Sequence, residues 1–266
     1  MKAEFVSQVE QRLNTAKTVA FDAGKLLMRH WGNLSGYDHK GKVNLVSAAD
    51  RESEALVTVA IVNRYPDDAI LGEETGERPG TSGFRWVIDP LDGTTNFVHS
   101  HPTFAVCIAL EYAQKTVAGV VYLPATRELF FARQDGGAFG PGGPIACSAT
   151  SDLDLSLLGT GLPYRRREIL DILMEDWRRA ISSAQGLRRM GAAAVDLVYL
   201  ACGRTDGYWE RELKPWDTAA GTIIVEEAGG VVTDFSGGPY SPYEDEIAAS
   251  NGHIHAQLLK SLFGDR

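Results

Sequence analysis

The stretch Asp89-Pro90-Leu91-Asp92-Gly93 carries two aspartates in a turn-forming context. Pro90 and Gly93 favour a turn, so both carboxylates can converge on one point beside the Leu91 carbonyl. Oxygen-only ligands suit Mg²⁺, which is usually held by a few carboxylates together with water and a substrate phosphate. The next residues, Thr94-Thr95-Asn96, can begin a helix or tight turn whose free backbone N–H groups would face an anion. Metal ligands beside an anion site fit metal-assisted hydrolysis of a phosphate ester.

Two more acidic positions support this interpretation. Asp, Pro and Gly also favour solvated turns for local reasons, so the stretch alone leaves a plain turn equally open. Glu73, however, follows the short apolar run Ala69-Ile70-Leu71, and Asp217 opens a helical pattern far along the chain. Carboxylates therefore cluster at the ends of predicted elements.

Apolar spacing predicts the elements that hold these residues. Residues 4–31 repeat apolar side chains at three, four and seven positions and predict a long amphipathic helix. Ser47 and Asp50 have capping-box spacing before a second helix, which Tyr65-Pro66 ends. Segments 104–112, 116–123 and 128–132 are rich in Val, Ile, Phe and Tyr, and predict an antiparallel meander or part of a mixed sheet.

The strongest break in composition is Gly140-Pro141-Gly142-Gly143-Pro144. It divides the chain into an N-terminal α+β half, 1–144, with most of the acidic candidates, and an α/β half, 145–266, that completes the site. In the second half, short strands alternate with helical patterns at 166–182, 192–202, 217–228 and 253–263. We expect the two halves to form one compact catalytic unit.

Composition narrows the class of protein. The 266 residues carry 26 Lys+Arg and 35 Asp+Glu, and the net charge of -9 disfavours broad nucleic-acid binding. Three cysteines show neither disulfide nor zinc spacing, and no apolar run approaches the roughly 18 residues of a membrane span. The N-terminus lacks a secretory signal pattern, so we expect a cytoplasmic protein without a membrane partner.

Three blocks of the sequence resemble a known family. Trp86 to Phe97 is similar to the first signature of the inositol monophosphatase family, Trp216 to Gly230 to its second, and Gly72-Glu73-Glu74 to a third block. The resemblance extends over essentially the whole chain. It implies a layered αβαβα sugar-phosphatase fold, shared with fructose-1,6-bisphosphatase, and a homodimeric, lithium-sensitive, Mg²⁺-dependent phosphatase.

The resemblance also implies roles for individual residues. Glu73, Asp89 and the Leu91 carbonyl would hold one Mg²⁺, and Glu73 would help to hold a third, weaker ion. A second ion would be held by Asp89, Asp92 and Asp217. Gly93 and Thr94 would bind the phosphate through backbone N–H groups, and Thr94 with Asp50 would orient and deprotonate the water on the metal. The family usually has Asp at the position of Asn44, which bears on a nearby loop and the third metal.

Substrate contacts follow from the same resemblance. Glu210 falls at the position that accepts hydrogen bonds from inositol hydroxyls, and Gly191-Ala192-Ala193 matches the backbone segment beside that ring. By composition alone, Glu210 is equally well a surface charge. These positions favour inositol 1-phosphate, and a carboxylate would serve an amino-alcohol such as histidinol phosphate almost as well.

Two further phosphate esters and a non-enzyme role also fit the sequence. Fructose 1,6-bisphosphate and 3′-phosphoadenosine 5′-phosphate would use the same metal site with a different leaving group. Because some bacterial relatives associate with the transcription machinery, the non-enzyme role is that of a binding module, with Arg188 and Arg189 as weak motivating features.

Overall fold

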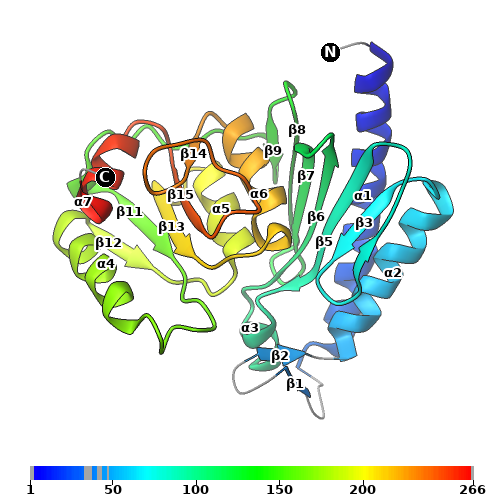
Figure 1. The fold of residues 1–266 in the computed structure, drawn as a ribbon, viewed down its shortest axis with the longest axis horizontal. Helices are drawn as coiled ribbons and strands as arrows, with labels where there is room; N and C mark the ends of the chain where they lie inside the picture. Colours follow the sequence, from blue (N-terminus) through cyan, green and yellow to red (C-terminus); the bar gives the residue numbers. More distant parts are fainter. Residues whose placement is uncertain (1–2, 33–37, 41–43, 47, 265–266) are drawn as a thin grey trace.

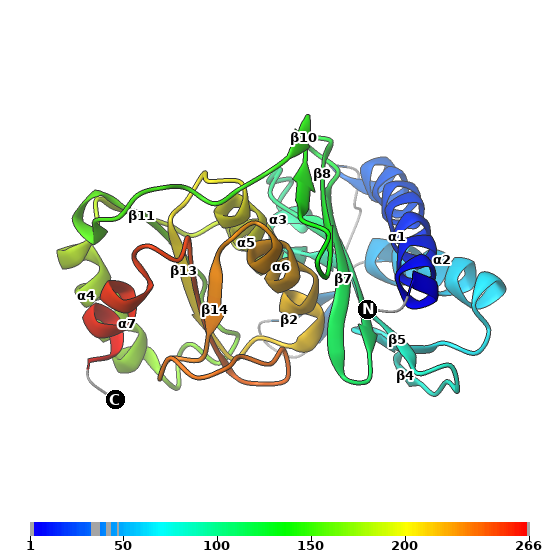
Figure 2. The ribbon, with the colours of Figure 1, turned by 90° about the horizontal axis from the view of Figure 1, so that it is seen from above.

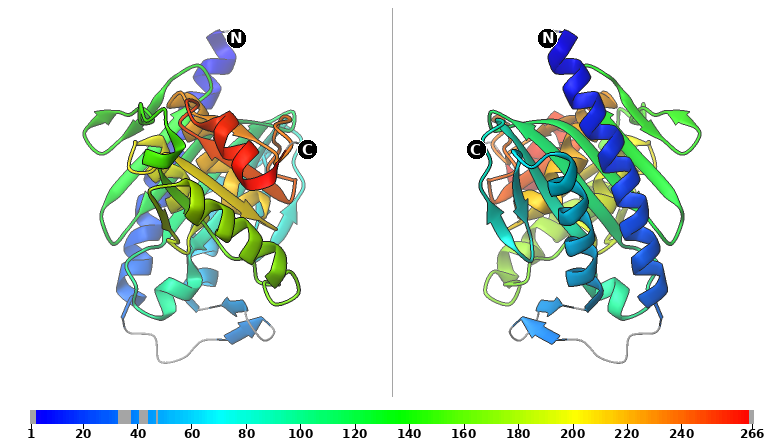
Figure 3. Two further views of the ribbon diagram at one scale, coloured as in Figure 1. Left: turned by 90° about the vertical axis from the view of Figure 1, so that its left-hand side faces the viewer. Right: turned by 90° about the vertical axis from the view of Figure 1, so that its right-hand side faces the viewer.

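Two helices that pack along each other begin the chain. In the computed structural model, which describes residues 3–32, 38–40, 44–46 and 48–264, α1 spans Ala3–His30 and α2 spans Ala48–Arg64. Both helices were predicted from apolar spacing, and the right-hand view of Figure 3 shows them side by side on the outside of the molecule. Between them, the short strands β1 (Asp38–Lys40) and β2 (Asn44–Val46) pair antiparallel. Within the described ranges, no helix is both long and apolar enough to cross a membrane.

The first sheet has eight strands in the order β10-β9-β8-β7-β6-β5-β3-β4. β3 and β5 are parallel, and every other neighbouring pair is antiparallel. The predicted meander is confirmed as β6, β7 and β8, and the short helix α3 (Thr94–Val98) follows β5. The strands are β3 (Ala69–Gly72), β4 (Gly76–Arg78), β5 (Phe84–Asp92), β6 (Ala105–Tyr112), β7 (Lys115–Leu123), β8 (Glu128–Arg133), β9 (Ala138–Gly140) and β10 (Gly143–Pro144).

The second sheet has five strands in the order β12-β11-β13-β15-β14. β11 is parallel to β12 and β13, whereas β15 is antiparallel to both of its neighbours. This mixed sheet follows a 3-10 turn, η1 (Leu153–Leu155), and alternates with helices as predicted. Its elements are β11 (Leu157–Thr160), α4 (Leu170–Ser183), β12 (Gly186–Arg188), α5 (Ala193–Ala201), β13 (Gly207–Arg211), α6 (Pro215–Glu227), β14 (Val231–Thr233), β15 (Glu246–Ser250) and α7 (His255–Phe263).

The two sheets enclose a central layer of helices. Figures 1 and 2 show α5 and α6 between the sheets, with α1 and α2 outside the first sheet and α4 and α7 outside the second. The left-hand view of Figure 3 presents α4 and α7 on this second outer face. Because α6 is covered on both sides, residues 218–225 are all buried, and they are small or apolar residues and two threonines. The predicted αβαβα layering is confirmed.

The glycine- and proline-rich break lies at the edge of the first sheet. Within this stretch, Gly140 pairs with Gly143 in the β9–β10 ladder, and the chain then crosses to the second sheet. The cut at 144/145 therefore separates the two sheets. The two halves nevertheless share one hydrophobic core. A single cluster contains Val87 and Cys107 of the first sheet together with Tyr208 and Ile247 of the second.

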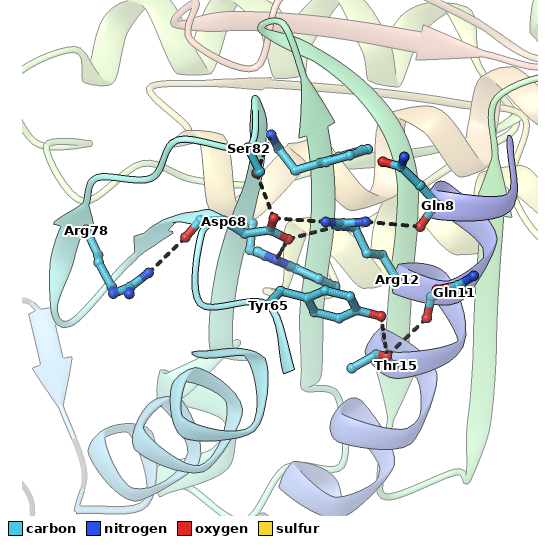
Figure 4. A network of polar contacts seen from close by, with 10 residues as sticks. Gln8, Gln11, Arg12, Thr15, Tyr65, Asp68, Arg78 and Ser82 are labelled. Atoms are coloured by element: carbon cyan, nitrogen blue, oxygen red, sulfur yellow. Dashed lines mark hydrogen bonds and ion pairs between the residues drawn. The ribbon is translucent and has the colours of Figure 1, made fainter. Parts of the chain in front are cut away.

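A buried ion pair ties α1 to the first sheet (Figure 4). The Arg12 guanidinium donates through Nε and Nη2 to the two carboxyl oxygens of Asp68, at 2.8 and 2.9 Å. Asp68 also accepts from Trp86 Nε1 at 2.9 Å and from Ser82 Oγ at 2.7 Å. The guanidinium carbon lies 3.9 Å from the centre of the Phe84 ring. Charge-assisted bonds of this kind satisfy a buried carboxylate fully.

Candidate active site

An irregularity at the end of β5 brings Asp89 and Asp92 into the interior. Asp89 still pairs with Cys107 of β6, but the register shifts before Asp92 pairs with Ala105. The Asp89 carboxylate accepts a hydrogen bond from the Leu91 N–H at 2.9 Å across this irregularity. Both aspartates are buried there, but residues 89–92 still belong to β5, so the turn predicted between the two carboxylates is wrong: a strand irregularity takes its place, and the chain turns only at Gly93.

Gly93 redirects the chain from this strand into α3. Its φ of 88° is left-handed, a conformation that glycine adopts without a Cβ penalty. A Cβ there would lie 2.9 Å from the Thr103 carbonyl oxygen and 3.1 Å from Cβ of Ala192. Thr94, the first residue of α3, donates its hydroxyl to the Leu91 carbonyl at 3.1 Å. That carbonyl has a second lone pair and can still bind a cation.

Asp217 reaches the site from the start of α6. Lys214 caps the helix: its N–H donates to an Asp217 carboxyl oxygen at 2.7 Å, and the Asp217 N–H donates to the Lys214 carbonyl at 3.0 Å. Pro215 occupies the first helical turn, where a missing N–H has no cost. These contacts fix the carboxylate at the N-terminal end of a fully packed helix.

Glu73 is positioned by a residue that the sequence reasoning missed. The Glu73 N–H donates to the Ile88 carbonyl at 3.2 Å, which fastens the end of β3 beside β5. Glu54 of α2 is 0% exposed and accepts hydrogen bonds from the backbone N–H groups of Glu74 and Thr75, each at 2.8 Å. The Glu54 carboxylate thus holds the β3–β4 turn that carries Glu73.

Asp50 and Ser53 lie on the same face of α2 as Glu54, since residues three and four apart are neighbours on a helix. Asp50 is buried in the first turn. Ser53 donates its hydroxyl to the Pro90 carbonyl at 3.0 Å, so this end of α2 lies against the irregular end of β5. Asp50 was already a candidate in the sequence. The helical spacing of three and four residues from it could therefore have pointed to Ser53 and Glu54.

The carboxylates of the site oppose one another's ionisation. Burial raises the pKa of Asp89 well above its usual range, with further repulsion from Glu73, Asp92 and Asp217. Burial also raises the pKa of Asp92 to about 7, with repulsion from Glu210 and Glu73 and an opposing hydrogen bond from the Ala194 N–H. For Asp217, burial and the charge of Asp92 raise the pKa to about 7. Acids from β3, β5 and α6 therefore act on one another as a single electrostatic cluster.

This donor set has the chemistry of a site for a hard cation. Each aspartate uses one carboxyl oxygen to accept a backbone N–H: Asp89 from Leu91, Asp92 from Ala194 at 2.8 Å, and Asp217 from Lys214. Across the described ranges, no three His, Cys, Asp or Glu side chains are arranged so that they could hold one ion. Mg²⁺ commonly takes only one or two carboxylates and keeps several waters, so the oxygen-only donors fit it. The assignment of one ion to Asp89, Asp92 and Asp217 together stays a prediction.

The segment 190–193 lies directly beside Gly93, where the chain enters α3. Asn96 of α3 donates through Nδ2 to the Thr103 carbonyl at 2.7 Å and to the Met190 carbonyl at 2.9 Å. Gly191 has a φ of 80°, and Ala192 and Ala193 are buried. The structure thus brings Gly191, Ala192 and Ala193 next to Gly93, as the substrate prediction requires, through an asparagine that the sequence reasoning did not single out.

Glu210 is a buried acid on β13 and not a surface charge. Tyr208, two residues earlier on the same face of the strand, donates its hydroxyl to Glu210 Oε2. Burial raises the pKa of Glu210 to about 7, an effect that the Tyr208 hydrogen bond opposes and the Asp217 charge increases. Glu210 therefore belongs electrostatically to the same cluster as the three aspartates. Side chains of 33–47, including Asn44, lie outside the described residues.

Comparison with known proteins identifies the family. The family model described as the inositol monophosphatase family matches residues 8–263. The chain belongs to the inositol monophosphatase family. Members of this family are phosphatases, so the expectation of a phosphoric monoester hydrolase is confirmed at that level.

Relatives within the inositol monophosphatase family carry two kinds of name. An inositol-1-monophosphatase of Synechocystis is 43% identical over 258 residues, covering 96% of this chain and 90% of that protein. The Nus factor SuhB of Escherichia coli is 38% identical over 253 residues, covering 94% and 95%. Both relatives show the family to which this chain belongs, but they do not show its individual activity.

Solved structures of family members share the fold. The extragenic suppressor protein SuhB of Bartonella henselae superposes with a TM-score of 0.92 at 40% identity, covering 95% of this chain and 98% of that one. The inositol monophosphatase of Anabaena superposes with a TM-score of 0.86 at 41% identity, covering 96% of each chain. Both agree with the layered architecture described above.

Proposed function

We propose that the chain is a Mg²⁺-dependent phosphomonoesterase whose substrate is inositol 1-phosphate. The observation that carries this proposal is a cluster of carboxylates in which Asp89, Asp92 and Glu210 are buried and Asp217 and Glu73 are half-buried. Buried carboxylates are costly unless they are paired or bind a cation, and oxygen donors favour magnesium. Relatives named inositol-1-monophosphatase support the choice of substrate.

The proposed ligands come from both halves of the chain. Glu73, Asp89 and the Leu91 carbonyl would hold one Mg²⁺, and Glu73 would help to hold a third, weaker ion. Asp89, Asp92 and Asp217 would hold the second. When bound, the ions supply Lewis-acid stabilisation of the phosphoryl group and of the departing alkoxide. The backbone donors to the aspartates hold the carboxylates in orientation before the ions arrive.

The chain's own groups carry the remaining work of the proposed reaction. Gly93 and Thr94 offer backbone N–H groups to the phosphate at the start of α3. The Thr94 hydroxyl and the buried Asp50 carboxylate orient the attacking water and take its proton. No covalent phosphoenzyme is required, because direct in-line attack by water completes the hydrolysis.

Glu210 selects the leaving group in this proposal. Its carboxylate accepts hydrogen bonds from ring hydroxyls, beside the Gly191–Ala193 backbone. A carboxylate also pairs with an ammonium group, so histidinol phosphate is the second choice of substrate. Fructose 1,6-bisphosphate and 3′-phosphoadenosine 5′-phosphate would use the same metal ligands with different contacts at Glu210.

The test is phosphate release from these four esters with Mg²⁺ and with a chelator. We expect release that depends on Mg²⁺, with the highest kcat/KM for inositol 1-phosphate, and inhibition by Li⁺. Preference for another ester would keep the metal-dependent hydrolysis and replace the substrate. No release from any ester at saturating Mg²⁺ would reject the enzyme.

A homodimer is part of the proposal. Three large apolar side chains of α4, four and seven positions apart and so on one side of the helix, are about half exposed or more: Leu170 at 51%, Met174 at 49% and Ile181 at 64%. Exposed apolar groups on one side of a helix commonly mark an interface. Sedimentation equilibrium should give twice the chain mass of 28.9 kDa. A single-chain mass at micromolar concentration would contradict the dimer.

A second candidate function is contact with the transcription machinery. The specific observation is that relatives at 38–39% identity are named Nus factor SuhB or putative Nus factor SuhB. Arg188 and Arg189 are exposed and offer a small basic surface. Binding of the purified chain to purified RNA polymerase or a transcription factor, lost in an Arg188→Glu, Arg189→Glu double variant, would support it. Absence of binding would remove it.

A further inference from the structure

Asn96 of α3 is a polar side chain that the proposed reaction does not use. Its amide nitrogen donates to the Thr103 carbonyl at 2.7 Å and to the Met190 carbonyl at 2.9 Å, with a weaker contact of 3.4 Å to the Gly191 carbonyl. A primary amide has two N–H donors, and the two shorter bonds use both of them. One side chain therefore joins the residues that follow α3 to a segment far along the chain.

The segment 190–194 is also held at its other end. The Asp92 carboxylate accepts a hydrogen bond from the Ala194 N–H at 2.8 Å, at the start of α5. Asn96 thus holds the first residue of the segment, Met190, and Asp92 holds the last. Both of these side chains come from one short stretch of chain, 92–96, so that stretch determines where the whole segment lies.

The residues between these two hydrogen bonds offer backbone N–H groups. Gly191 has a left-handed φ of 80°, and Ala192 is extended, with a φ of -152°, and 3% exposed. Among the residues that the structure describes, no acceptor takes the N–H of either residue. An unpaired N–H on a buried residue is uncommon in folded proteins. These two donors are therefore suited to bind oxygen atoms of a ligand.

The same contacts place this segment against Gly93. A Cβ on Gly93 would lie 3.1 Å from the Ala192 Cβ and 2.9 Å from the Thr103 carbonyl oxygen, which is the oxygen that Asn96 binds. Asn96 therefore contacts both neighbours of Gly93, the Thr103 carbonyl on one side and the segment 190–194 on the other. The spacing between Gly93 and the free N–H groups of the segment depends on this one amide.

We propose that Asn96 is a positioning residue that fixes the segment 190–194 at a set distance from Gly93 and so favours phosphate esters whose leaving group carries hydroxyls. The inference rests on the proposed function, because it takes Gly93 as part of the phosphate site and Gly191 to Ala193 as the backbone beside the leaving group. Asn96 itself touches no substrate. An ester without such hydroxyls uses the phosphate site alone and should depend much less on Asn96.

Two variants test the proposal. Asn96→Ala removes the amide, whereas Asn96→Asp keeps its shape and replaces the donor with an oxygen that faces two carbonyl oxygens. We would measure kcat and KM with Mg²⁺ for inositol 1-phosphate and for 4-nitrophenyl phosphate, an ester without ring hydroxyls. In Asn96→Ala, the ratio of kcat/KM for inositol 1-phosphate to that for 4-nitrophenyl phosphate should fall about tenfold, mainly through a higher KM for inositol 1-phosphate. In Asn96→Asp, the ratio should fall at least as far.

A parallel loss on both esters would overturn the proposal, because Asn96 would then support the whole site and not the spacing between its two parts. An Asn96→Asp variant with the wild-type ratio would also overturn it, because the amide donor would then be unnecessary. If neither variant folds, Asn96→Ser replaces them. Serine is smaller and keeps one donor, so the ratio should fall by a smaller factor, and an unchanged ratio would refute the role of Asn96.

A matched control separates selectivity from stability. Asn251 is 3% exposed and donates through Nδ2 to Ser148 Oγ at 2.9 Å and to the Thr150 carbonyl at 2.8 Å. Asn251→Asp therefore removes the same kind of donor from another asparagine. It should lower the free energy of unfolding without changing the ratio of the two esters.

Failure of the proposed function is read from the wild type, before any variant is compared. If the wild type prefers another ester with hydroxyls or an ammonium group, the substrate assignment fails, and the ratio is taken with that ester over 4-nitrophenyl phosphate. If the wild type releases phosphate from no ester at saturating Mg²⁺, the proposed function is rejected, and the role of Asn96 is rejected with it.

Discussion

Asp92→Asn should stabilise the metal-free protein while it removes most of the activity. Burial raises the pKa of Asp92 to about 7 in the fold, against about 3.9 in an unfolded chain. Each pKa unit corresponds to about 1.4 kcal/mol, so ionisation of Asp92 at pH 8 opposes folding by up to about 4 kcal/mol. Several acids titrate together here, and we therefore expect a gain of about 1–3 kcal/mol for the variant. The asparagine oxygen can still accept the Ala194 N–H.

The sign of the pH dependence follows from the direction of the shift. Because the pKa of Asp92 is higher in the folded state, that state holds the proton over a range in which the unfolded chain has released it. The wild type without metal should therefore lose stability as pH rises from about 4 to about 7 and then level off. In Asp92→Asn, the loss of stability with rising pH should be smaller by the amount that Asp92 contributes in the wild type.

The assay is urea unfolding at pH 5 and pH 8, with a chelator or with saturating Mg²⁺. With chelator at pH 8 the variant should unfold at higher urea than the wild type, and the difference should shrink at pH 5. Mg²⁺ should stabilise the wild type more than the variant, because the variant has lost a ligand charge. Phosphate release should fall by about two orders of magnitude or more in the variant.

A variant that is less stable than the wild type at pH 8 with chelator would refute this reasoning. So would a metal-free wild type whose stability rises between pH 5 and pH 8. Asp68→Asn is the control, since its carboxylate is fully paired, and it should be destabilised with and without Mg²⁺.

Three further substitutions test other parts of the structure. Gly93→Ala should lower the free energy of unfolding by about 1–3 kcal/mol and reduce kcat. The φ of 88° and the Thr103 carbonyl, 2.9 Å from the new Cβ, leave no place for a methyl group. Thermal melting would check the stability and steady-state kinetics the kcat. Asp68→Ala should cost about 3–5 kcal/mol in urea unfolding, since it leaves Arg12 unpaired in a largely buried site, with the ratio of kcat/KM for two esters unchanged. Glu210→Gln should reduce kcat/KM for inositol 1-phosphate or histidinol phosphate far more than for 4-nitrophenyl phosphate, and an equal reduction on all would exclude Glu210 from substrate recognition.

The sequence was sufficient where local chemistry and periodicity determine the structure. The helices α1 and α2 and the meander β6–β8 follow from apolar spacing. The turn expected between Asp89 and Asp92 is instead an irregularity within β5, and the chain turns at Gly93, after both carboxylates. The strands β9 and β10, of three and two residues, are too short to show a period and were not predicted.

Residues whose role depends on distant contacts could not be found in this way. Glu54 occupies a helical position like any exposed glutamate, and only the approach of the β3–β4 turn, 20 residues away, shows that it is buried and bonded. Asn96 contacts the Met190 carbonyl 94 residues along the chain. Asp196 lies in the apolar segment Ala193–Ala201, and only the placement of α5 between the two sheets shows that this aspartate is buried.

The central helices have a consequence for the order in which the protein is made. The first sheet is complete once residue 144 has been synthesised, but its inner face, with Val87, Cys107 and Val121, is covered by α5 and α6, which end at Glu227. Until then the emerging chain carries an uncovered apolar sheet, the kind of surface on which nascent proteins aggregate. Under the proposed ligand set, the second cation cannot bind in this early state, because Asp217 arrives on the same late helix. Chaperone protection of the growing chain would therefore matter most between the completion of β10 and the completion of α6.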